Sequence, residues 1–159
     1  MQNDDSFTLD KVDIEILRRL QENARMPYQD IADELRISAG TVHGRLAKMK
    51  EAGVITGSKF TVDPRRIGLE VTTFIGVNLR SANDLKKTIE IMRSFEEVVE
   101  VHYTTGQYGL FVKVMVESTK ALHSFLLNKL QTIPEIHSTE TFVSLDNPIQ
   151  REGKLPLAK

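Results

Sequence analysis

The chain has 159 residues, enough for one medium-sized domain or two small ones, and a formal net charge of −1. It contains no cysteine, which excludes disulfides, thiolate metal sites and a cysteine nucleophile, and fits a reducing, cytoplasmic setting. The sequence contains no run of about 18 apolar residues, so it predicts no membrane-spanning helix. The polar, acidic start MQNDDSFTLD is unlike a secretory signal.

Two helices are predicted near the N-terminus. Residues 9–23 carry apolar side chains on one stripe at helical spacing, and either Thr8 or Asp10 can cap this helix. A second helix over 28–35 follows Pro27, which suits a first-turn position. The side chains expected to face inward are Val12, Ile16, Leu17, Leu20, Ile31, Ala32 and Leu35, with Ile14 at the flank of the stripe.

A third helix and a hairpin are predicted to complete the first domain. The helix starts after Ser38, a favourable N-cap residue, and stops before Gly53, where a helix-ending glycine belongs. After Gly53 the segment VITGSKFTVD alternates with a period of two, which predicts two short strands that turn at 56–58. Three helices and a hairpin are typical of a winged helix-turn-helix, with an unrelated three-helix bundle as the alternative. The buried face of the third helix is expected to be Val42, Leu46 and Met49.

The segment DPRRIGLE, residues 63–70, reads as a linker because it contains a proline and a glycine between two patterned regions. We therefore expect a DNA-binding domain over 1–62 and a second domain over 71–146. Residues 147–159 form a polar tail that contains proline, which predicts loose order.

The second domain is predicted to follow the order βαββαβ, with strands over 71–80, 98–105, 110–117 and 136–145 and helices over 82–94 and 119–132. This is the split βαβ of ferredoxin-like folds, so the fold class is α+β, with one antiparallel sheet and both helices on one face. The helix residues expected to face inward are Leu85, Ile89, Met92, Leu122, Phe125, Leu126 and Leu130.

The opposite face of that sheet has no cover in the sequence. An uncovered sheet face with apolar side chains predicts a dimerisation surface. The aromatic and aliphatic residues that this pattern leaves to one face or the other are Phe74, Val101, Tyr103, Phe111 and Phe142.

The third helix combines small residues with positive charge, since residues 36–59 carry a net charge of +4. Gly40 and Gly44 each disfavour a helix by about 1 kcal/mol relative to alanine. We interpret them as room for the helix backbone to approach base edges in the major groove. Close packing against a neighbouring helix is the alternative for the glycines, and a solvated helix face is the alternative for the charge. The candidate DNA-contacting residues are Ser38, Ala39, Gly40, Thr41, His43, Arg45, Lys48 and Lys59.

Individual roles follow from side-chain chemistry. Thr41 can offer a hydrogen bond or a methyl contact, and Arg45 can bind guanine through two hydrogen bonds. The lysines, Lys48, Lys50 and Lys59, are suited to phosphates. His43 is a weak candidate, because an exposed helical histidine is more often incidental. The histidines lack metal-ligand spacing and no glycine-rich phosphate loop follows a strand, so we expect neither a metal site nor an enzyme.

Several segments, in order, resemble the Lrp/AsnC family of amino-acid-responsive transcription regulators over residues 9–149, and its asparagine-responsive branch more than its leucine-responsive one. These segments are LDKVDIEILRRLQENAR, SAGTVHGRLAKMKEAGVITG, HYTTGQYGLFVKVM and LLNKLQTIPEIHSTETFVSLDNP. The resemblance implies binding to double-stranded DNA and a RAM/ACT-like βαββαβ domain that senses an amino acid. It also implies homodimers that often assemble into octamers, with the effector between neighbouring dimers.

Carried onto this sequence, the resemblance implies an effector site made of Tyr103, Thr104, Thr105, Gly106, Gln107, Tyr108, Gly109, Ser138, Thr139, Glu140 and Thr141. Many relatives carry acidic residues in the glycine loop, where this chain has Gln107 and Gly109. We therefore expect backbone N–H groups near Gly106 to meet the carboxylate of the effector. Carbonyls, threonine hydroxyls or Glu140 would meet its ammonium.

This pattern favours asparagine or another small polar amino acid over leucine. Two alternatives stay open. The glycines of the loop can serve only to shape the connection between the strands. The whole chain can be an architectural protein of the same fold that wraps DNA without an effector.

Overall fold

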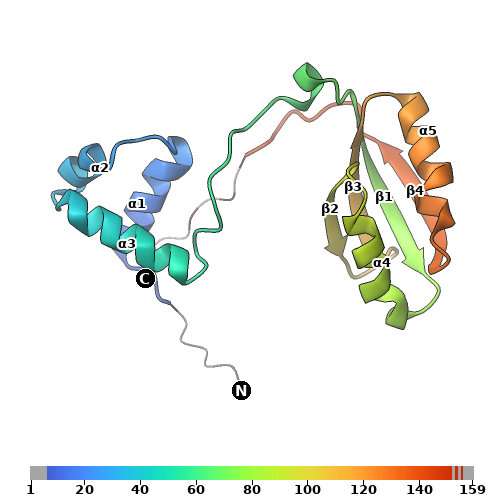
Figure 1. The fold of residues 1–159 in the computed structure, drawn as a ribbon, viewed down its shortest axis with the longest axis horizontal. Helices are drawn as coiled ribbons and strands as arrows, with labels where there is room; N and C mark the ends of the chain where they lie inside the picture. The colour runs from blue at the N-terminus through green and yellow to red at the C-terminus, as the bar shows by residue number, and fades with distance from the viewer. Residues whose placement is uncertain (1–6, 152, 154, 156–159) are drawn as a thin grey trace. The chain divides into compact units, whose positions relative to one another are not determined.

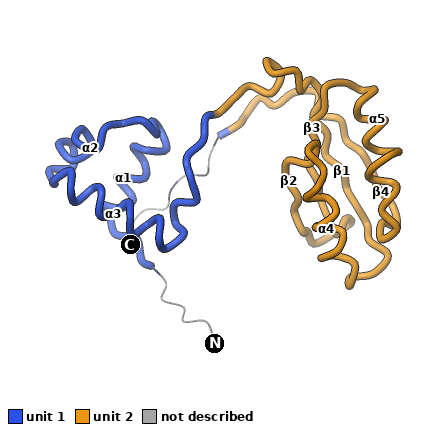
Figure 2. The backbone as a smooth tube through the Cα atoms, viewed as in Figure 1, with its two compact units in different colours: residues 1–60, 151–159 blue, residues 61–150 orange. Residues whose placement is uncertain are grey.

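The computed structural model describes residues 7–151, 153 and 155. The chain divides into two compact units, residues 1–60 with 151–159 and residues 61–150 (Figures 1 and 2). Each unit has its own cluster of buried apolar side chains. Within the described ranges, no helix is both long enough and apolar enough to cross a membrane.

The first unit contains three helices, α1 (Lys11–Glu22), α2 (Tyr28–Leu35) and α3 (Ala39–Glu51). Asp10 caps α1, as one of the two sequence alternatives predicts. Its carboxylate accepts a hydrogen bond from the backbone N–H of Asp13 at 2.8 Å, and the Asp13 carboxylate accepts one from the N–H of Asp10 at 3.1 Å. This reciprocal pair satisfies two N–H groups that a helix start otherwise leaves without partners.

The tight turn between α2 and α3 is confirmed. Arg36 ends α2 in the left-handed region, with φ of 56°, and the N–H of Ile37 donates to the carbonyl of Ala32 at 3.0 Å. Ser38 then caps α3 by accepting a hydrogen bond from the Thr41 N–H at 3.0 Å. The predicted inward face of α3 is buried, with Val42 and Met49 at 0% exposure and Leu46 at 8%.

The predicted hairpin after Gly53 does not form, since residues 54–63 contain no strand. The backbone N–H groups of Val54 and Ile55 both donate to the carbonyl of Met49, which fixes only the start of this segment. Farther along, Phe60 is 75% exposed and lies under the Arg25 guanidinium, 4.7 Å from the ring centroid to Cζ. An isolated two-stranded hairpin is marginally stable at best, and here its apolar side chains find little surface to bury against.

The second unit is a four-stranded sheet with two helices, as the βαββαβ pattern predicts. The strands lie in the order β2-β3-β1-β4 and every neighbouring pair is antiparallel. The strands are β1 (Val71–Leu79), β2 (Val98–Tyr103), β3 (Leu110–Val116) and β4 (Ile136–Val143), and the helices are α4 (Leu85–Arg93) and α5 (Thr119–Asn128).

Both helices pack on one face of this sheet. Met92 of α4 and Phe125 of α5 are buried in one cluster with alternate residues of the central strands. Both helices are shorter than the sequence predicts: residues 82–84 form a separate 3-10 helix, and α5 ends before Lys129. The backbone of Lys129 has non-helical dihedral angles, with φ of −122° and ψ of −65°, and its ammonium binds the Glu97 carboxylate at 2.7 Å.

The other face of the sheet carries an aromatic cluster. Phe74, Phe111 and Phe142 lie there, with the rings of Phe74 and Phe111 stacked at 5.8 Å between centroids. Val101 instead packs with the helix-side core, and Tyr103 ends β2 with 72% of its surface exposed. Strand alternation thus assigns three of the five residues that the sequence left open to the uncovered face.

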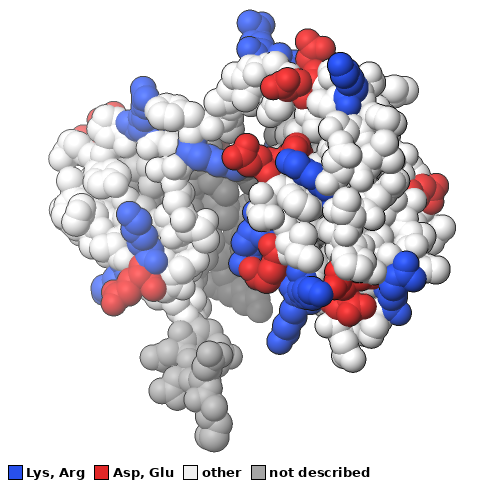
Figure 3. All heavy atoms as spheres, turned by 45° about the vertical axis from the view of Figure 1, so that its right-hand side comes forward, with Lys and Arg blue, Asp and Glu red and all other residues white. Residues whose placement is uncertain are grey.

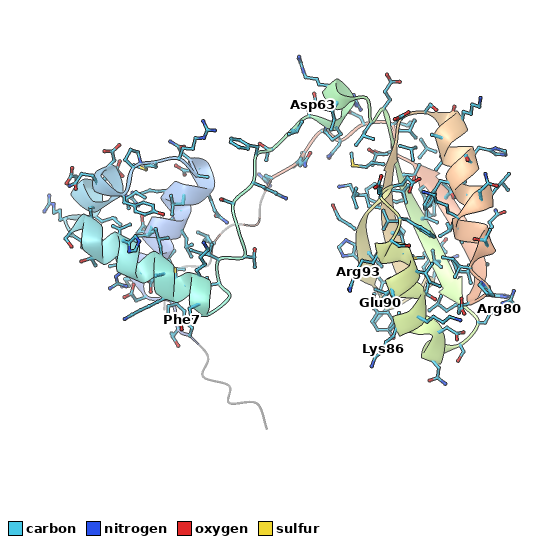
Figure 4. All side chains as sticks on the ribbon, in the orientation of Figure 1. Phe7, Asp63, Arg80, Lys86, Glu90 and Arg93 are labelled. Carbon is cyan, nitrogen blue, oxygen red and sulfur yellow. The ribbon has the colours of Figure 1, made fainter. Side chains whose placement is uncertain are left out.

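Charges of both signs are interspersed on the face of the second unit seen in Figure 3. Along α4, Lys86, Glu90 and Arg93 point away from the sheet (Figure 4), and Glu90 binds Arg93 at 3.1 Å. This exposed helix surface is a mixture of acids and bases, unlike the predominantly basic segment around α3.

The separate cores predict that the two units can be destabilised independently. We expect Met49→Ala to lower the free energy of unfolding of the first unit by about 2–5 kcal/mol, because it opens a cavity in a fully buried site. Phe125→Ala should do the same to the second unit alone, by about 3–5 kcal/mol. Calorimetry of the two variants checks this, and a single transition that both substitutions shift equally would contradict it.

Candidate DNA and effector sites

The outer face of α3 has open space at both of its glycines. Of the atoms in the described residues, a Cβ atom built on Gly44 would meet none within 4 Å, and one on Gly40 would meet only the Ser38 hydroxyl, at 3.7 Å. Among the described residues, no neighbouring helix packs closely against either glycine, so the packing alternative for them is wrong. The part of the chain that the structure describes therefore gives no packing reason for two residues that disfavour the helix.

An open recess of about 460 Å³ runs beside this face, and Figure 4 labels Phe7, which lines it near α3. The residues that line it are Phe7, Thr8, Asp13, Thr41, Gly44, Arg45 and Lys48. It brings together three of the predicted DNA-contacting residues, Thr41, Arg45 and Lys48. Its lining combines hydrogen-bonding groups with the cations of Arg45 and Lys48 and the carboxylate of Asp13.

Arg45 is already engaged within the protein. Its Nη1 donates to Asp10 Oδ2 at 2.6 Å and to Asp13 Oδ1 at 2.8 Å. The two carboxylates raise the pKa of Arg45, and the pKa of Asp10 is lowered by the Asp13 N–H and then by the Arg45 guanidinium. The sequence pattern predicts a guanine contact for Arg45 and gives no sign of these two intramolecular bonds.

The other predicted DNA residues lie in different settings. Ser38 and Thr41 share a hydrogen bond between their hydroxyls at 2.8 Å, so Ser38 serves first as a cap. Ala39 packs partly against the core. His43 is exposed beside Tyr28, with 6.3 Å between ring centroids. Lys59 lies beyond α3 in the segment without a strand and is not among the residues of the recess.

The second candidate site is the loop between β2 and β3. The Thr104 N–H donates to the Gly109 carbonyl at 3.0 Å, and the Thr104 hydroxyl donates to the Tyr108 carbonyl at 2.6 Å. Gly106 has φ of 116°, a backbone conformation that side chains other than glycine rarely adopt. These bonds close a compact turn around Thr105, Gly106 and Gln107, which are exposed.

Tyr108 folds from this loop onto the uncovered face of the sheet. A Cβ atom on Gly76 of β1 would lie 2.5 Å from the Tyr108 ring, so the ring fits only because this position is glycine. The Tyr108 hydroxyl donates to the Glu140 carboxylate, which raises the pKa of the phenol. Glu140 pairs with Gly76 across β1 and β4, which places it at this same spot.

The remaining predicted effector residues divide between the two faces of the sheet. Ser138 lies on the face of Glu140 and accepts a hydrogen bond from the Asn78 amide at 3.4 Å. Thr139 and Thr141 pair with Val77 and Ile75, whose side chains are buried on the helix side. The alternation of β4 thus brings Ser138 and Glu140 to the loop side and turns the two threonines away.

Sequence reasoning missed several residues of both sites. Asp10 and Asp13 hold Arg45, although Asp10 was considered only as a cap. Gly76 and the rings of Phe111 and Phe142 surround Tyr108, with 6.3 Å from its centroid to each ring centroid. A glycine inside the strand pattern TFIGVNL was the available signal, because such a glycine often marks a close approach of another group.

Comparison with protein families matches both units. Residues 9–56 match a winged helix-turn-helix DNA-binding model, and residues 72–153 match the Lrp/AsnC ligand binding domain. The chain is 47% identical over 146 residues to the regulatory protein AsnC of Haemophilus influenzae, covering 92% of this chain and 97% of the relative. It is 46% identical over 150 residues to AsnC of Escherichia coli K12, covering 94% and 99%.

Solved structures give the same result. The E. coli AsnC structure superposes with a TM-score of 0.90 at 45% identity, covering 94% of this chain and all of that one. A Neisseria meningitidis transcriptional regulator in complex with L-methionine has a TM-score of 0.86 at 26% identity, covering 94% and 97%. The resemblance and the fold class drawn from the sequence are thereby confirmed. The chain belongs to the Lrp/AsnC family and is a DNA-binding transcriptional regulator with a ligand-binding domain.

Proposed function

We propose that α3 enters the major groove with its outer face and reads base edges there. The observation that carries this proposal is the empty space around Gly40 and Gly44, which lets the helix backbone come close to the bases. Thr41 would supply hydrogen bonds and a methyl contact to bases. The exposed lysines, Lys48, Lys50 and Lys59, would bind phosphates and set the register.

The second unit, in this proposal, binds a free amino acid, with asparagine or a similar small polar one as the effector. Backbone N–H groups near Gly106 would take the carboxylate, and Glu140 would take the ammonium. Glu140 lies beside the loop, and its carboxylate accepts a hydrogen bond from the Tyr108 hydroxyl. Among its described contacts there is no cation, so the carboxylate can pair with the ammonium of a ligand. The methionine complex of the Neisseria relative supports an amino acid as the ligand class.

We further propose that two copies dimerise through the uncovered sheet face and that dimers assemble into an octamer in the cytoplasm. The aromatic cluster of Phe74, Phe111 and Phe142 supports this, because covering an exposed apolar face with a partner lowers the free energy of the assembly. An effector that binds one arrangement of dimers better than another would shift the population toward it, and DNA occupancy with it.

Gly44→Ala separates helix stability from DNA binding. The first unit should become more stable by roughly 0.5–1 kcal/mol, because alanine is the better helix former and its methyl group has no described neighbour within 4 Å. Affinity for the cognate duplex should fall at least about tenfold, or about 1.4 kcal/mol, as the methyl group obstructs approach to the bases. Titration against cognate and random duplexes checks this, and unchanged cognate affinity would contradict it.

Lys48→Ala should weaken binding to cognate and random duplexes by the same factor. One lost phosphate contact should also reduce the slope of log affinity against log salt by about 0.9. Lys120→Ala on α5 is the matched control, since Lys120 is equally an exposed helical lysine but lies in the other unit. A loss confined to the cognate duplex would instead make Lys48 a base-reading residue.

A thermal-shift screen of the twenty amino acids tests the effector. A true effector at about 100 times its dissociation constant should stabilise the second unit by roughly 2.7 kcal/mol. Glu140→Gln should reduce that shift, because it removes the charge opposite the ammonium, whereas the exposed Glu117→Gln should leave it intact. No shift with any amino acid would favour the architectural alternative, in which the protein wraps DNA without an effector.

A further inference from the structure

One arginine side chain joins the DNA-reading helix to the first helix of the unit. Arg45 lies on the flank of α3, between the exposed Gly44 and the buried Leu46. Its Nη1 reaches Asp10 and Asp13 at the start of α1, at 2.6 and 2.8 Å. Because these two carboxylates also cap α1 with each other's backbone N–H groups, the guanidinium completes a closed network of three side chains.

The network is partly withdrawn from water. The Asp13 side chain is 6% exposed and the Arg45 side chain 30% exposed, whereas Asp10 remains half exposed. A buried carboxylate that loses its cation is strongly unfavourable, so Asp13 restrains the guanidinium where it is. For Arg45 to reach a base, it would have to abandon both carboxylates.

The network also borders the recess. Asp13 and Arg45 line it together with Thr41, Gly44 and Lys48. Without the guanidinium, two negative charges would stand next to the residues proposed to meet DNA, where they would repel phosphate. Arg45 therefore has two effects there: it holds α3 against α1 and it neutralises acidic groups beside the reading face.

We propose that Arg45 is a positioning residue for DNA reading and makes no base contact itself. This rests on the proposed role of α3 in the major groove. Arg45 fixes the rotation of α3 through Asp13 and Asp10, so that Thr41 and the two glycines face the duplex in one register.

The test uses a duplex that the wild-type chain selects from a randomised pool. Failure of the wild-type chain to select any sequence would defeat the proposed function itself. With a selected duplex in hand, affinities are measured for Arg45→Met, Asp13→Asn and the double variant. If Arg45 acts through Asp13, each single variant loses roughly tenfold or more in specific affinity, and the double variant loses no more than either single one.

A base-reading arginine gives the opposite pattern. Asp13→Asn would then release the guanidinium, and specific affinity would stay unchanged or rise. Replacing each guanine in turn by 7-deazaguanine, which lacks the N7 acceptor, adds a direct readout. Under the proposal every replacement has the same effect on the wild type and on Arg45→Met. A penalty that disappears only in Arg45→Met would overturn it.

Asp10→Asn is a milder variant, which keeps the proposal testable if the other variants fail to fold. Asp10 is half exposed, and its replacement leaves the ion pair between Arg45 and Asp13 in place. We expect it to lower specific affinity about two- to threefold, with the salt dependence of the wild type. Arg45→Lys should retain part of the affinity, since lysine can still pair with one carboxylate. Full wild-type affinity in both Asp10→Asn and Arg45→Met would also overturn the proposal.

Discussion

The burial of one side of α3 determines what its other side can do. Val42, Leu46 and Met49 are held in the core of the first unit, which fixes the rotation of the helix about its axis. The exposed side includes Gly40, Gly44, Lys48 and Lys50, and none of the described residues packs over the glycines. Packing against the core thus stabilises a helix that its own glycines disfavour. The outer surface of the helix can therefore carry small and basic residues.

The second unit depends on a similar division between two surfaces. Strand alternation sends one set of side chains into the core beneath α4 and α5, and the other set to an uncovered face with an aromatic cluster. Tyr108 brings the candidate effector loop onto that same face, where Glu140 accepts its hydroxyl. The proposed ligand site and the proposed dimer surface are therefore contiguous through one side chain, which offers a physical route for coupling between them.

Much of this was predictable because hydrophobic spacing and capping are local. The bounds of α2, the Ser38 cap, the inward face of α3 and the βαββαβ order all follow from patterns of a few residues. The prediction of a hairpin after Gly53 was wrong because period-two alternation does not reveal whether the two strands have an apolar surface to pack against. The Arg45 network and the seat of Tyr108 on Gly76 were not predictable either, since they join residues 32 or more positions apart, which only the fold brings together.

The two glycines in α3 have a consequence for attempts to isolate its recognition surface. A synthetic peptide that spans residues 38–53 would lack the core that holds the helix, and an isolated helix of this length is marginal in water even without glycine. Such a peptide should be unstructured and a poor mimic of the regulator. Grafting the outward residues onto an independently stable scaffold helix is the more promising way to transfer the sequence preference to another protein.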